Sequence, residues 1–377
     1  MCIMRKKIAF LINTLGHGGA EKVLVNLLNN IDHEKYDVSL ICLFKHGVNR
    51  DYLNRGIKIR YIIPFLIRGN RFIQKIFSPE LLYKLTIGSE RFDLVVSFLE
   101  GITTRIISGC HDSTKKIAWV HVEMHSDSEL LKSFRSTEEY TKAYKSMDAV
   151  VGVSKDVINS FSKTTGLNLP YVVKYNVNET SVIKEKSILP INAPFKIDKA
   201  GLTFCSVGRL TEQKGYLRLI DVLYRLKKEG YSFHMHILGE GHQKTKIEKK
   251  ISTYKLNEVI TLWGYDPNPY KYVRRCDVFI CSSLYEGLST AVTESLIVGT
   301  PVITTKCSGT DELLSDGRFG MVVENNADAL YLGLKRLLNN KNIVDDYKSR
   351  LAESVLPFEK DKTVKSIEEF FDNIMAN

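Results

Sequence analysis

Short apolar runs recur along the first half of the chain and alternate with segments of helical spacing. The first run, residues 8–12, leads into the glycine turn 16–19, and residues 20–29 then carry apolar side chains at helical intervals. Similar runs follow at residues 38–44, 57–62, 94–98, 117–120, 149–153 and 171–173. Continuous apolar strands separated by helices are typical of a mainly parallel sheet that is covered on both faces. The pattern therefore predicts a doubly wound α/β domain.

A second series of apolar runs begins after a polar stretch at residues 178–201, which contains Pro190 and Pro194 and predicts a linker. The runs of this series are residues 202–207, 234–238, 259–263, 278–282, 302–305 and 320–323. Residues 358–375 predict a final helix with one apolar side. Two doubly wound domains that face each other would leave a cleft at the carboxyl ends of their strands, where open α/β sheets usually bind ligands.

The composition supports a soluble protein of two domains. Its 377 residues exceed one ordinary core, and 44% hydrophobic with 25% charged residues is typical of a globular chain. The formal net charge of +10 favours phosphate-rich partners or anionic membrane surfaces and does not choose between them. No segment approaches the roughly 20 apolar residues that cross a bilayer, so any membrane contact would be peripheral.

The cysteines and the basic N-terminus fit a chain in the cytosol. Seven cysteines are scattered without a C-x-x-C pair, so the sequence suggests neither a disulfide framework nor a zinc site. Arg5, Lys6 and Lys7 precede an apolar run of only about five residues, whereas a signal peptide needs about 7 to 15. We interpret this run as the first strand.

The strongest chemical signal is a pair of carboxylates eight residues apart, Glu286 and Glu294. We expect Glu286 in the loop after a strand, Ser289 or Thr290 as the cap of the following helix, and Gly299 at its end. Ionised carboxylates accept hydrogen bonds from hydroxyls, so we assign Glu286 to a sugar hydroxyl and Glu294 to the hydroxyls of a ribose. The alternative is that both are ordinary acidic residues near a helix N-terminus.

The turn between these carboxylates would bind an anion through its backbone. It runs from Glu286 through Gly287 to the expected start of the helix. The N–H groups of Leu288, Ser289 and Thr290 would point into the cleft, where a helix N-terminus favours a diphosphate.

A second signal is the segment 206–215, which lies between a predicted strand and the helix that follows it. Arg209 offers a planar fork and Lys214 a point charge, two complementary ways of holding phosphate oxygens. Both would stabilise negative charge on a departing nucleoside diphosphate. Taken alone, this pair also fits a solvated surface loop.

The glycine turn after the first strand is a weaker signal. Gly16, Gly18 and Gly19 lack the G-x-G-x-x-G spacing, and no Walker lysine follows, so binding of a dinucleotide or binding by a P-loop is not supported. These glycines either let the backbone approach a ligand or simply permit a tight turn.

Four motifs occur in one order along almost the whole chain. They are Gly18-Gly19-Ala20-Glu21, Gly208-Arg209-Leu210 with Lys214-Gly215, Gly239-Glu240-Gly241, and Glu286-x7-Glu294. In this conjunction the chain resembles the family 4 glycosyltransferases of the GT-B fold, including the bacterial enzymes of surface-polysaccharide assembly. The resemblance implies an α/β protein of two Rossmann-like domains that face a cleft, residues 1–180 for the acceptor and residues 196–356 for the nucleotide sugar. Residues 357–377 are then expected to form a helix that returns to the first domain.

The resemblance also implies a chemistry. Such enzymes move a sugar from a nucleotide diphosphate donor, here expected to be a UDP-sugar, to an acceptor hydroxyl with retention of configuration and usually without a bound metal. The middle of the chain has no D-x-D carboxylate pair, and Arg209 and Lys214 would do the electrostatic work of a metal. No side chain need act as a nucleophile, because a phosphate oxygen is thought to take the proton from the acceptor.

Further site residues follow from the resemblance. His121 corresponds to a histidine that hydrogen-bonds at the donor sugar or acceptor, Tyr265 would contact the base, and Gly239 and Gly241 would shape a loop near the nucleotide. His121 also fits a structural histidine after a strand, and Tyr265 fits a buried packing residue.

The acceptor side is indicated by a basic, apolar-studded segment. Its residues are Arg68, Arg71, Phe72, Lys75, Ile76 and Phe77. Such a segment would lie on an anionic membrane, which suits a cytoplasmic enzyme at the inner face of the plasma membrane with a lipid-linked sugar acceptor. An amphipathic helix that covers the sheet is the alternative.

Two other functions compete with sugar transfer. The first is another enzyme of the same fold, such as a nucleotide-sugar epimerase or a phosphorylase. An epimerase would bind a similar ligand, although the carboxylate pair with Arg209 and Lys214 favours transfer. A nucleic-acid-binding protein would explain the positive charge, but the sequence carries no RNA- or DNA-binding module and no clustered aromatic platform.

Overall fold

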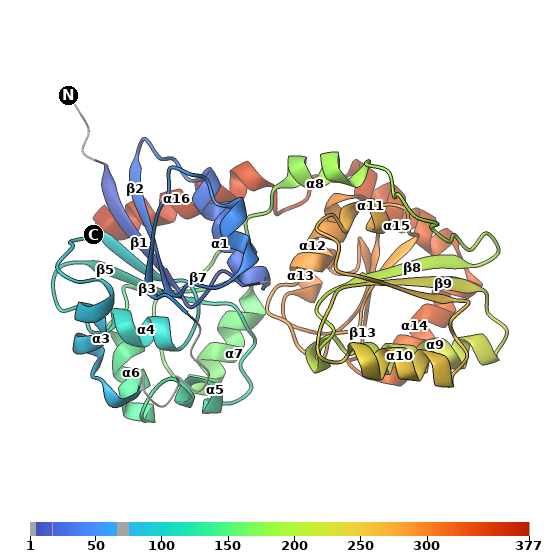
Figure 1. Cartoon of the computed structure of the whole chain (residues 1–377), viewed down its shortest axis with the longest axis horizontal. Coiled ribbons are helices and arrows are strands. Elements are labelled where there is room, and N and C mark those ends of the chain that lie inside the picture. Colours follow the sequence, from blue (N-terminus) through green and yellow to red (C-terminus); the bar gives the residue numbers. More distant parts are fainter. Residues whose placement is uncertain (1–4, 17, 66–74, 377) are drawn as a thin grey trace. The chain divides into compact units, whose positions relative to one another are not determined.

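The computed structural model describes residues 5–16, 18–65 and 75–376, and the chain divides into two compact units. Unit 1 consists of Met1–Asn178 and Phe358–Asn377, and unit 2 of Glu179–Pro357. In each unit, helices cover both faces of one central sheet (Figure 1). The predicted α/β class with two doubly wound sheets is therefore confirmed.

Unit 1 is built on a parallel seven-stranded sheet of order β3-β2-β1-β4-β5-β6-β7. Its inner strand β1 is buried from Ile8 to Ile12 because helices cover both faces. The strands are β1 (Lys6–Ile12), β2 (Tyr36–Phe44), β3 (Lys58–Ile63), β4 (Leu94–Ser97), β5 (Lys115–Val120), β6 (Ala149–Gly152) and β7 (Tyr171–Val173). The helices include α1 (Gly19–Asn30), η1 (Val48–Tyr52), α3 (Pro79–Thr86), α4 (Ile102–Ile107), α5 (Ser128–Leu131), α6 (Thr137–Lys145) and α7 (Lys155–Thr165).

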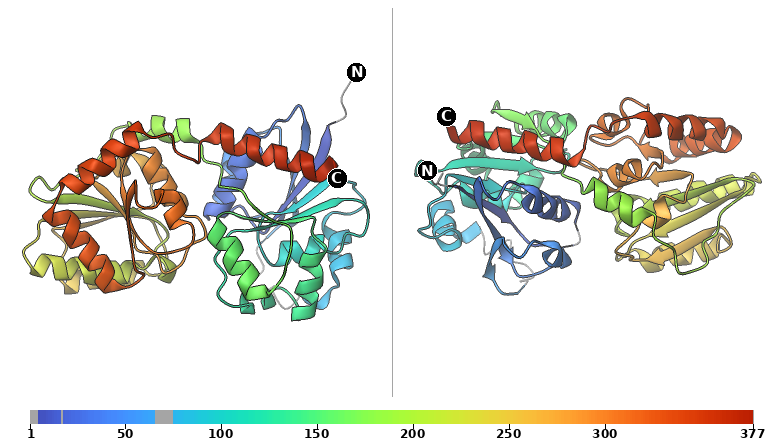
Figure 2. Two further views of the ribbon diagram at one scale, coloured as in Figure 1. Left: turned by 180° about the vertical axis from the view of Figure 1, so that it is seen from behind. Right: turned by 90° about the horizontal axis from the view of Figure 1, so that it is seen from above.

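The C-terminal helix α16 (Lys360–Ala376) packs on the sheet of unit 1. Figure 2 shows this helix lying along the unit in both views. The ring of Phe371 meets that of Phe10 on β1 edge to face, with centroids 6.0 Å apart. The hydroxyl of Tyr36 donates to Asp372 Oδ1 over 2.8 Å. An apolar core contact and a polar rim contact therefore fix the same helix.

Unit 2 repeats the design with a parallel six-stranded sheet of order β10-β9-β8-β11-β12-β13. The strands are β8 (Leu202–Val207), β9 (Phe233–Leu238), β10 (Ile260–Gly264), β11 (Val278–Cys281), β12 (Val302–Thr305) and β13 (Gly320–Val323). The helices are α8 (Thr180–Ser187), η2 (Glu212–Lys214), α9 (Tyr216–Lys228), α10 (Lys244–Thr253), α11 (Tyr270–Val273), α12 (Thr290–Ile297), α13 (Thr310–Leu314), α14 (Ala327–Asn339) and α15 (Asn342–Glu353).

All thirteen strands predicted from the sequence are present, with ends that differ by at most two residues. The linker prediction was wrong in its first part, because residues 180–187 form helix α8. This helix packs on α11 and α12, buries Ile183, and accepts a hydrogen bond at the carbonyl of Lys186 from Asn268 Nδ2 over 2.9 Å. Its polar composition hid one buried face, and the two prolines lie beyond its end.

The described part of the chain contains six cysteines, all of them buried and none in a disulfide. None of the helices within residues 5–16, 18–65 and 75–376 combines the length and the hydropathy that a membrane span requires.

Candidate active site

The loop after β8 lies against the loop after β9 in unit 2. The Leu210 N–H donates to the carbonyl of Glu240 over 2.9 Å, and the Gly208 N–H donates to that of Leu238 over 3.0 Å. A Cβ on Gly239 would lie 1.9 Å from the carbonyl oxygen of Gly208, and the φ of Gly239 is +139°. A Cβ on Gly241 would meet a backbone oxygen at 2.3 Å. Only glycine permits this approach, which fixes the backbone on both sides of Arg209.

Lys214 and Glu286 meet between the loops that follow β8 and β11. Lys214 Nζ lies 2.6 Å from Glu286 Oε1, and the hydroxyl of Ser283 donates to the same oxygen over 2.6 Å. Burial alone would lower the pKa of Lys214, but the carboxylate beside it raises that pKa above its usual value. Lys214 therefore keeps its charge inside the unit, beside the carboxylate that it contacts.

The turn after β11 is held from outside by side chains that the sequence analysis did not select. Arg218, in the first turn of α9, donates to the carbonyl of Ser282 over 2.7 Å and to Asn325 Oδ1 over 2.8 Å. The hydroxyl of Thr305 donates to the carbonyl of Ser283 over 2.6 Å. The only sequence signal for Arg218 is a cation four residues after Lys214 on an amphipathic helix, where solvated cations are common.

Helix α12 begins as predicted after Ser289, and Gly299 follows its end with φ +84°. Ser289 is the N-cap residue of this helix, as predicted, but it caps the helix without its side chain. Its hydroxyl accepts no capping hydrogen bond, is buried, and has no hydrogen-bond partner. It lines a small cavity of about 10 Å³, close to the space that one water molecule needs, together with Lys214 and Ser283. A buried hydroxyl without a partner is costly unless a ligand satisfies it.

The second carboxylate, Glu294, is buried on α12. Its Oε1 lies 3.5 Å from the hydroxyl of Tyr270, at the limit of a hydrogen bond. Arg209 and Tyr265 are instead exposed, with 56% of Tyr265 accessible to solvent. The alternative of Tyr265 as a buried packing residue is therefore wrong. Tyr265 follows Gly264, whose φ of +72° turns the chain after β10.

His121 directly follows β5 in unit 1 and is buried. Its ring lies 4.7 Å from that of Phe98 and stacks on Trp119 at 6.4 Å, while Nε2 has no hydrogen-bond partner. Burial lowers the pKa of His121 to about 3, so the ring is neutral near pH 7. The backbone N–H of His121 donates to Glu100 Oε2 over 3.0 Å, and burial raises the pKa of that carboxyl.

The glycine turn of unit 1 is closed by neighbouring side chains. A Cβ on Gly18 would lie 1.9 Å from Glu21 Oε2, so the carboxylate occupies the space beside this glycine. The side-chain amide of Asn49 donates to the carbonyl of Gly16. Gly19 is the first residue of α1 and is exposed. This geometry accounts for Gly18 through the packing of Glu21.

The basic segment is only partly visible. Arg68, Arg71 and Phe72 lie outside the described residues. The ammonium of Lys75 donates to the carbonyl of Leu131 and so is not a solvated cation, whereas 72% of Ile76 is exposed. Among the described residues, no three His, Cys, Asp or Glu side chains gather as a metal site.

Comparison with known proteins relates this chain to glycosyltransferases. Residues 190–354 match the family model described as glycosyl transferases group 1. The chain is also similar to N-acetylgalactosamine-N,N'-diacetylbacillosaminyl-diphospho-undecaprenol 4-alpha-N-acetylgalactosaminyltransferase of Campylobacter jejuni. The two are 26% identical over 374 residues, which cover 96% of this chain and 98% of that protein.

Two solved structures share the fold. Anabaena Alr3699/HepE, solved in complex with UDP and glucose, matches with a TM-score of 0.74 at 16% identity, over 98% of this chain and 100% of that chain. Sucrose-phosphate synthase of Thermosynechococcus elongatus matches with a TM-score of 0.76 at 13% identity, over 99% and 100%. Residues 190–354 thus form a group 1 glycosyltransferase domain within a chain of GT-B fold.

Proposed function

We propose that this glycosyltransferase takes a sugar from a nucleotide diphosphate sugar, a UDP-sugar, and retains the configuration at the anomeric carbon, as family 4 enzymes do. The observation that carries the proposal is the group formed by Lys214, Glu286 and the unpartnered hydroxyl of Ser289 at the start of α12. A cation, a helix N-terminus and a free buried hydroxyl together suit a diphosphate. The Anabaena protein of the same fold, solved with UDP and glucose, supports this donor.

Each predicted site residue has a role in this proposal. Arg209 and Lys214 stabilise the charge that develops on the departing diphosphate, and the turn from Glu286 through Gly287 and Leu288 to Thr290 carries the backbone amides that cradle it. Glu286 orients the sugar through a hydroxyl. No side chain acts as a nucleophile.

The remaining predicted residues bind the rest of the donor and the acceptor. Glu294 accepts hydrogen bonds from the ribose, and the exposed ring of Tyr265 stacks on the base. The neutral ring of His121 exchanges a hydrogen bond with a hydroxyl of the donor sugar or the acceptor, for which its unpartnered Nε2 is suited. Gly18 and Gly19 are proposed to bring the backbone close to the donor.

The acceptor in this proposal is a glycan carried on a polyprenyl diphosphate lipid, in surface-polysaccharide assembly at the cytoplasmic face of the plasma membrane. The Campylobacter jejuni relative supports it, since its name specifies an acceptor built on diphospho-undecaprenol. The net charge of +10 also favours a surface of anionic lipids.

We further propose that exposed apolar side chains of unit 1 touch this membrane. The apolar segment comprises Ile76, Phe77, Leu81 and Leu85, all of them exposed. Leu81 and Leu85 stand four residues apart on α3 and so share its outer face. Isolated exposed apolar residues are common, but a run of four within ten residues is typical of an interaction surface.

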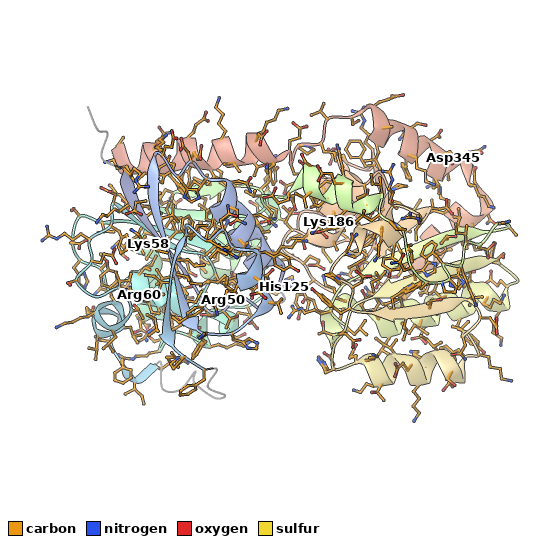
Figure 3. All side chains as sticks on the ribbon, turned by 45° about the horizontal axis from the view of Figure 1, so that its top comes forward. Arg50, Lys58, Arg60, His125, Lys186 and Asp345 are labelled. Atoms are coloured by element: carbon orange, nitrogen blue, oxygen red, sulfur yellow. The ribbon has the colours of Figure 1, made fainter. Side chains whose placement is uncertain are left out.

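The apolar segment is fixed firmly to the body of unit 1. Arg135 donates to the carbonyl of Ile76 over 2.7 Å, and the buried Arg105 donates to that of Phe77 over 2.8 Å. Glu139 Oε1 accepts from Arg105 over 2.8 Å. Burial alone would raise the pKa of Glu139, but the hydrogen bonds and charges of Arg105 and Arg135 together lower it. The side chain of Arg60 on β3 is labelled in Figure 3. It donates to the carbonyls of Thr86 and Ile87 at the end of α3. Because the apolar segment is already ordered, it loses less conformational entropy on binding than a flexible loop would.

Sugar transfer is tested with purified protein, radiolabelled UDP-sugars and a synthetic polyprenyl diphosphate glycan. We expect a labelled lipid product whose new bond has the anomeric configuration of the donor by NMR, and none with Glu286→Ala. Conversion of the UDP-sugar to its epimer without transfer would favour the epimerase. Excess EDTA should leave the rate unchanged; a loss that Mg²⁺ or Mn²⁺ restores would contradict the proposal that no metal is needed.

Membrane contact is tested by co-sedimentation with vesicles that contain phosphatidylglycerol. Ile76→Glu combined with Leu85→Glu should lower the bound fraction by about tenfold, because buried apolar area drives such binding. Leu332→Glu is the matched control, since Leu332 is 61% exposed on α14 of unit 2, as Leu85 is 60% exposed on α3. Equal binding by both variants would contradict the proposed surface.

A further inference from the structure

Glu286 is held by two donors of different kinds at a single oxygen. Lys214 and Ser283 both contact Oε1 over 2.6 Å. Lys214 is a cation that a phosphate can capture, whereas Ser283 is a neutral hydroxyl at 1% exposure, beneath the turn. The two donors will therefore respond differently when a diphosphate arrives.

A diphosphate competes with Glu286 for the charge of Lys214. The proposed donor site is the start of α12 beside Ser289, and Lys214 lines the same small cavity as Ser289. An incoming diphosphate attracts the ammonium and repels the carboxylate, and both effects weaken the ion pair. Without a second partner, Glu286 would be free to leave its place as the donor binds.

We propose that Ser283 is a positioning residue, which keeps Glu286 in the site while the donor diphosphate takes Lys214 from it. This inference rests on the proposed function. In the free protein, Lys214 is paired with Glu286 and is released from it when the donor binds. With the donor bound, Ser283 alone holds Oε1, and Oε2 remains available to accept a hydrogen bond from a sugar hydroxyl.

Ser283 is itself fixed well enough for this role. Its carbonyl accepts hydrogen bonds from Thr305 Oγ1 over 2.6 Å and from Arg218 Nη2 over 3.3 Å. Arg218 in turn donates to Asn325. The backbone on which the Ser283 hydroxyl stands is thus tied to β12 and to the loop before α14, independently of Lys214.

Calorimetric titration with UDP tests the exchange without any need for activity. Glu286→Gln keeps the shape and the acceptor oxygen but removes the competing charge, so it should bind UDP about tenfold more tightly than the wild type. Ser283→Ala should bind UDP within about twofold of the wild type, because the ion pair remains. Equal or weaker binding by Glu286→Gln would overturn the exchange while leaving the transferase proposal standing. If neither protein binds UDP, GDP or ADP, both proposals fail.

Single-turnover transfer then tests the role of Ser283. Ser283→Ala should lower the rate about tenfold with little change in the half-saturating donor concentration, and should add nothing to Glu286→Gln in the double variant. Independent, multiplying losses would mean that Ser283 does not act through Glu286. Ser295→Ala is the control, because it also deletes a buried hydroxyl of unit 2, one that donates to the carbonyl of Thr300 over 2.8 Å. Thermal unfolding of both variants compares their folding cost.

Discussion

The two units share the order of six strands but differ in the polar groups at their strand ends. The order β3-β2-β1-β4-β5-β6 in unit 1 corresponds strand by strand to β10-β9-β8-β11-β12-β13 in unit 2. In unit 2, the loops after β8 and β11 carry Arg209, Lys214 and Glu286. In unit 1, the loop after β4, which corresponds to β11, carries Glu100, and the loop after β5, which corresponds to β12, carries His121. The common fold therefore offers similar strand ends in both units, and the residues placed there set the chemistry.

Burial acts on both sets of residues, with different results. In unit 2, the ion pair with Glu286 overcomes burial and raises the pKa of Lys214, so charge is kept. In unit 1, no opposite charge offsets burial, which lowers the pKa of His121 to about 3 and raises that of Glu100. A buried charge persists only with a partner. We infer that unit 2 is suited to an anion and that this part of unit 1 is suited to neutral hydroxyls.

The largest effect should come from removing a cation of unit 2. Arg209→Ala is expected to lower the transfer rate by about a thousandfold, because one group that stabilises developing charge contributes about 3 to 4 kcal/mol. Initial rates with saturating UDP-sugar measure it. Arg225→Ala is the control, since Arg225 is also exposed and pairs with Asp328 on the surface; it should stay within about twofold of the wild type. A rate for Arg209→Ala close to that of the control would contradict the charged role of unit 2.

A smaller loss is expected from the neutral residue of unit 1. His121→Phe keeps an aromatic ring against Phe98 and removes both ring nitrogens, so kcat/KM should fall by about 10- to 100-fold. The melting temperature should not fall, because the substitution removes a buried nitrogen that has no partner. Unchanged kinetics with a lower melting temperature would mean that His121 is only a packing residue.

Most of the fold could be predicted because its signal is local. Most strands are short apolar runs, of which residues 8–12 are buried on both faces, and the helices between them follow apolar spacing. The sequence pattern did not predict helix α8, because the helix buries little beyond Ile183. Its boundary with the linker also depends on packing against α11 and α12. A contact of that kind leaves no periodic trace in the sequence.

The candidate site was only partly predictable for the same reason. Motifs indicated that Lys214 and Glu286 matter, yet they are 72 residues apart and nothing in the sequence shows that they pair. Arg218 and Ser283 carry no motif, because their importance lies in the carbonyl and carboxylate that they touch. The exposure of Tyr265 likewise depends on how the chain turns after β10.

Low pH should lower the free energy of unfolding through two buried, neutral histidines. Burial lowers the pKa of His121 to about 3 and that of His236 in unit 2 to about 4, so at low pH the unfolded chain, with a histidine pKa of about 6.5, binds protons that the folded protein refuses. Their contribution to stability is complete above pH 6.5 or so and is lost as the pH falls toward 4 and then 3. Each histidine should cost about 1.4 kcal/mol per pH unit in that window.

Urea unfolding at about pH 7.5 and pH 5 measures this loss. Between those pH values, the free energy of unfolding of His121→Phe should fall by about 2 kcal/mol less than that of the wild type, because the variant lacks one group that binds a proton only when unfolded. The contribution of His236 remains in both proteins. His236 is neutral for a structural reason, since Nδ1 accepts from Trp263 Nε1 over 2.9 Å and Nε2 faces the carbonyl of Lys196. An unchanged slope in His121→Phe would show that His121 binds its proton in the folded protein over the same pH range as in the unfolded chain.

The smallest effect should come from Tyr265, which in unit 2 offers a neutral contact beside the charged ones. Stacking of one base on an aromatic ring is worth about 1 to 3 kcal/mol, and a ring that is 56% exposed belongs at the lower end, so Tyr265→Ala should raise the donor KM by about three- to tenfold. The value of kcat should change little, because the base lies away from the bond that breaks. Tyr265→Phe keeps the ring and should match the wild type; a loss as large as that of the alanine variant would assign the contact to the hydroxyl. A large fall in kcat with either variant would show that Tyr265 contributes to the bond-breaking step, as the charged groups of unit 2 are proposed to do. A role limited to binding the base would then be wrong.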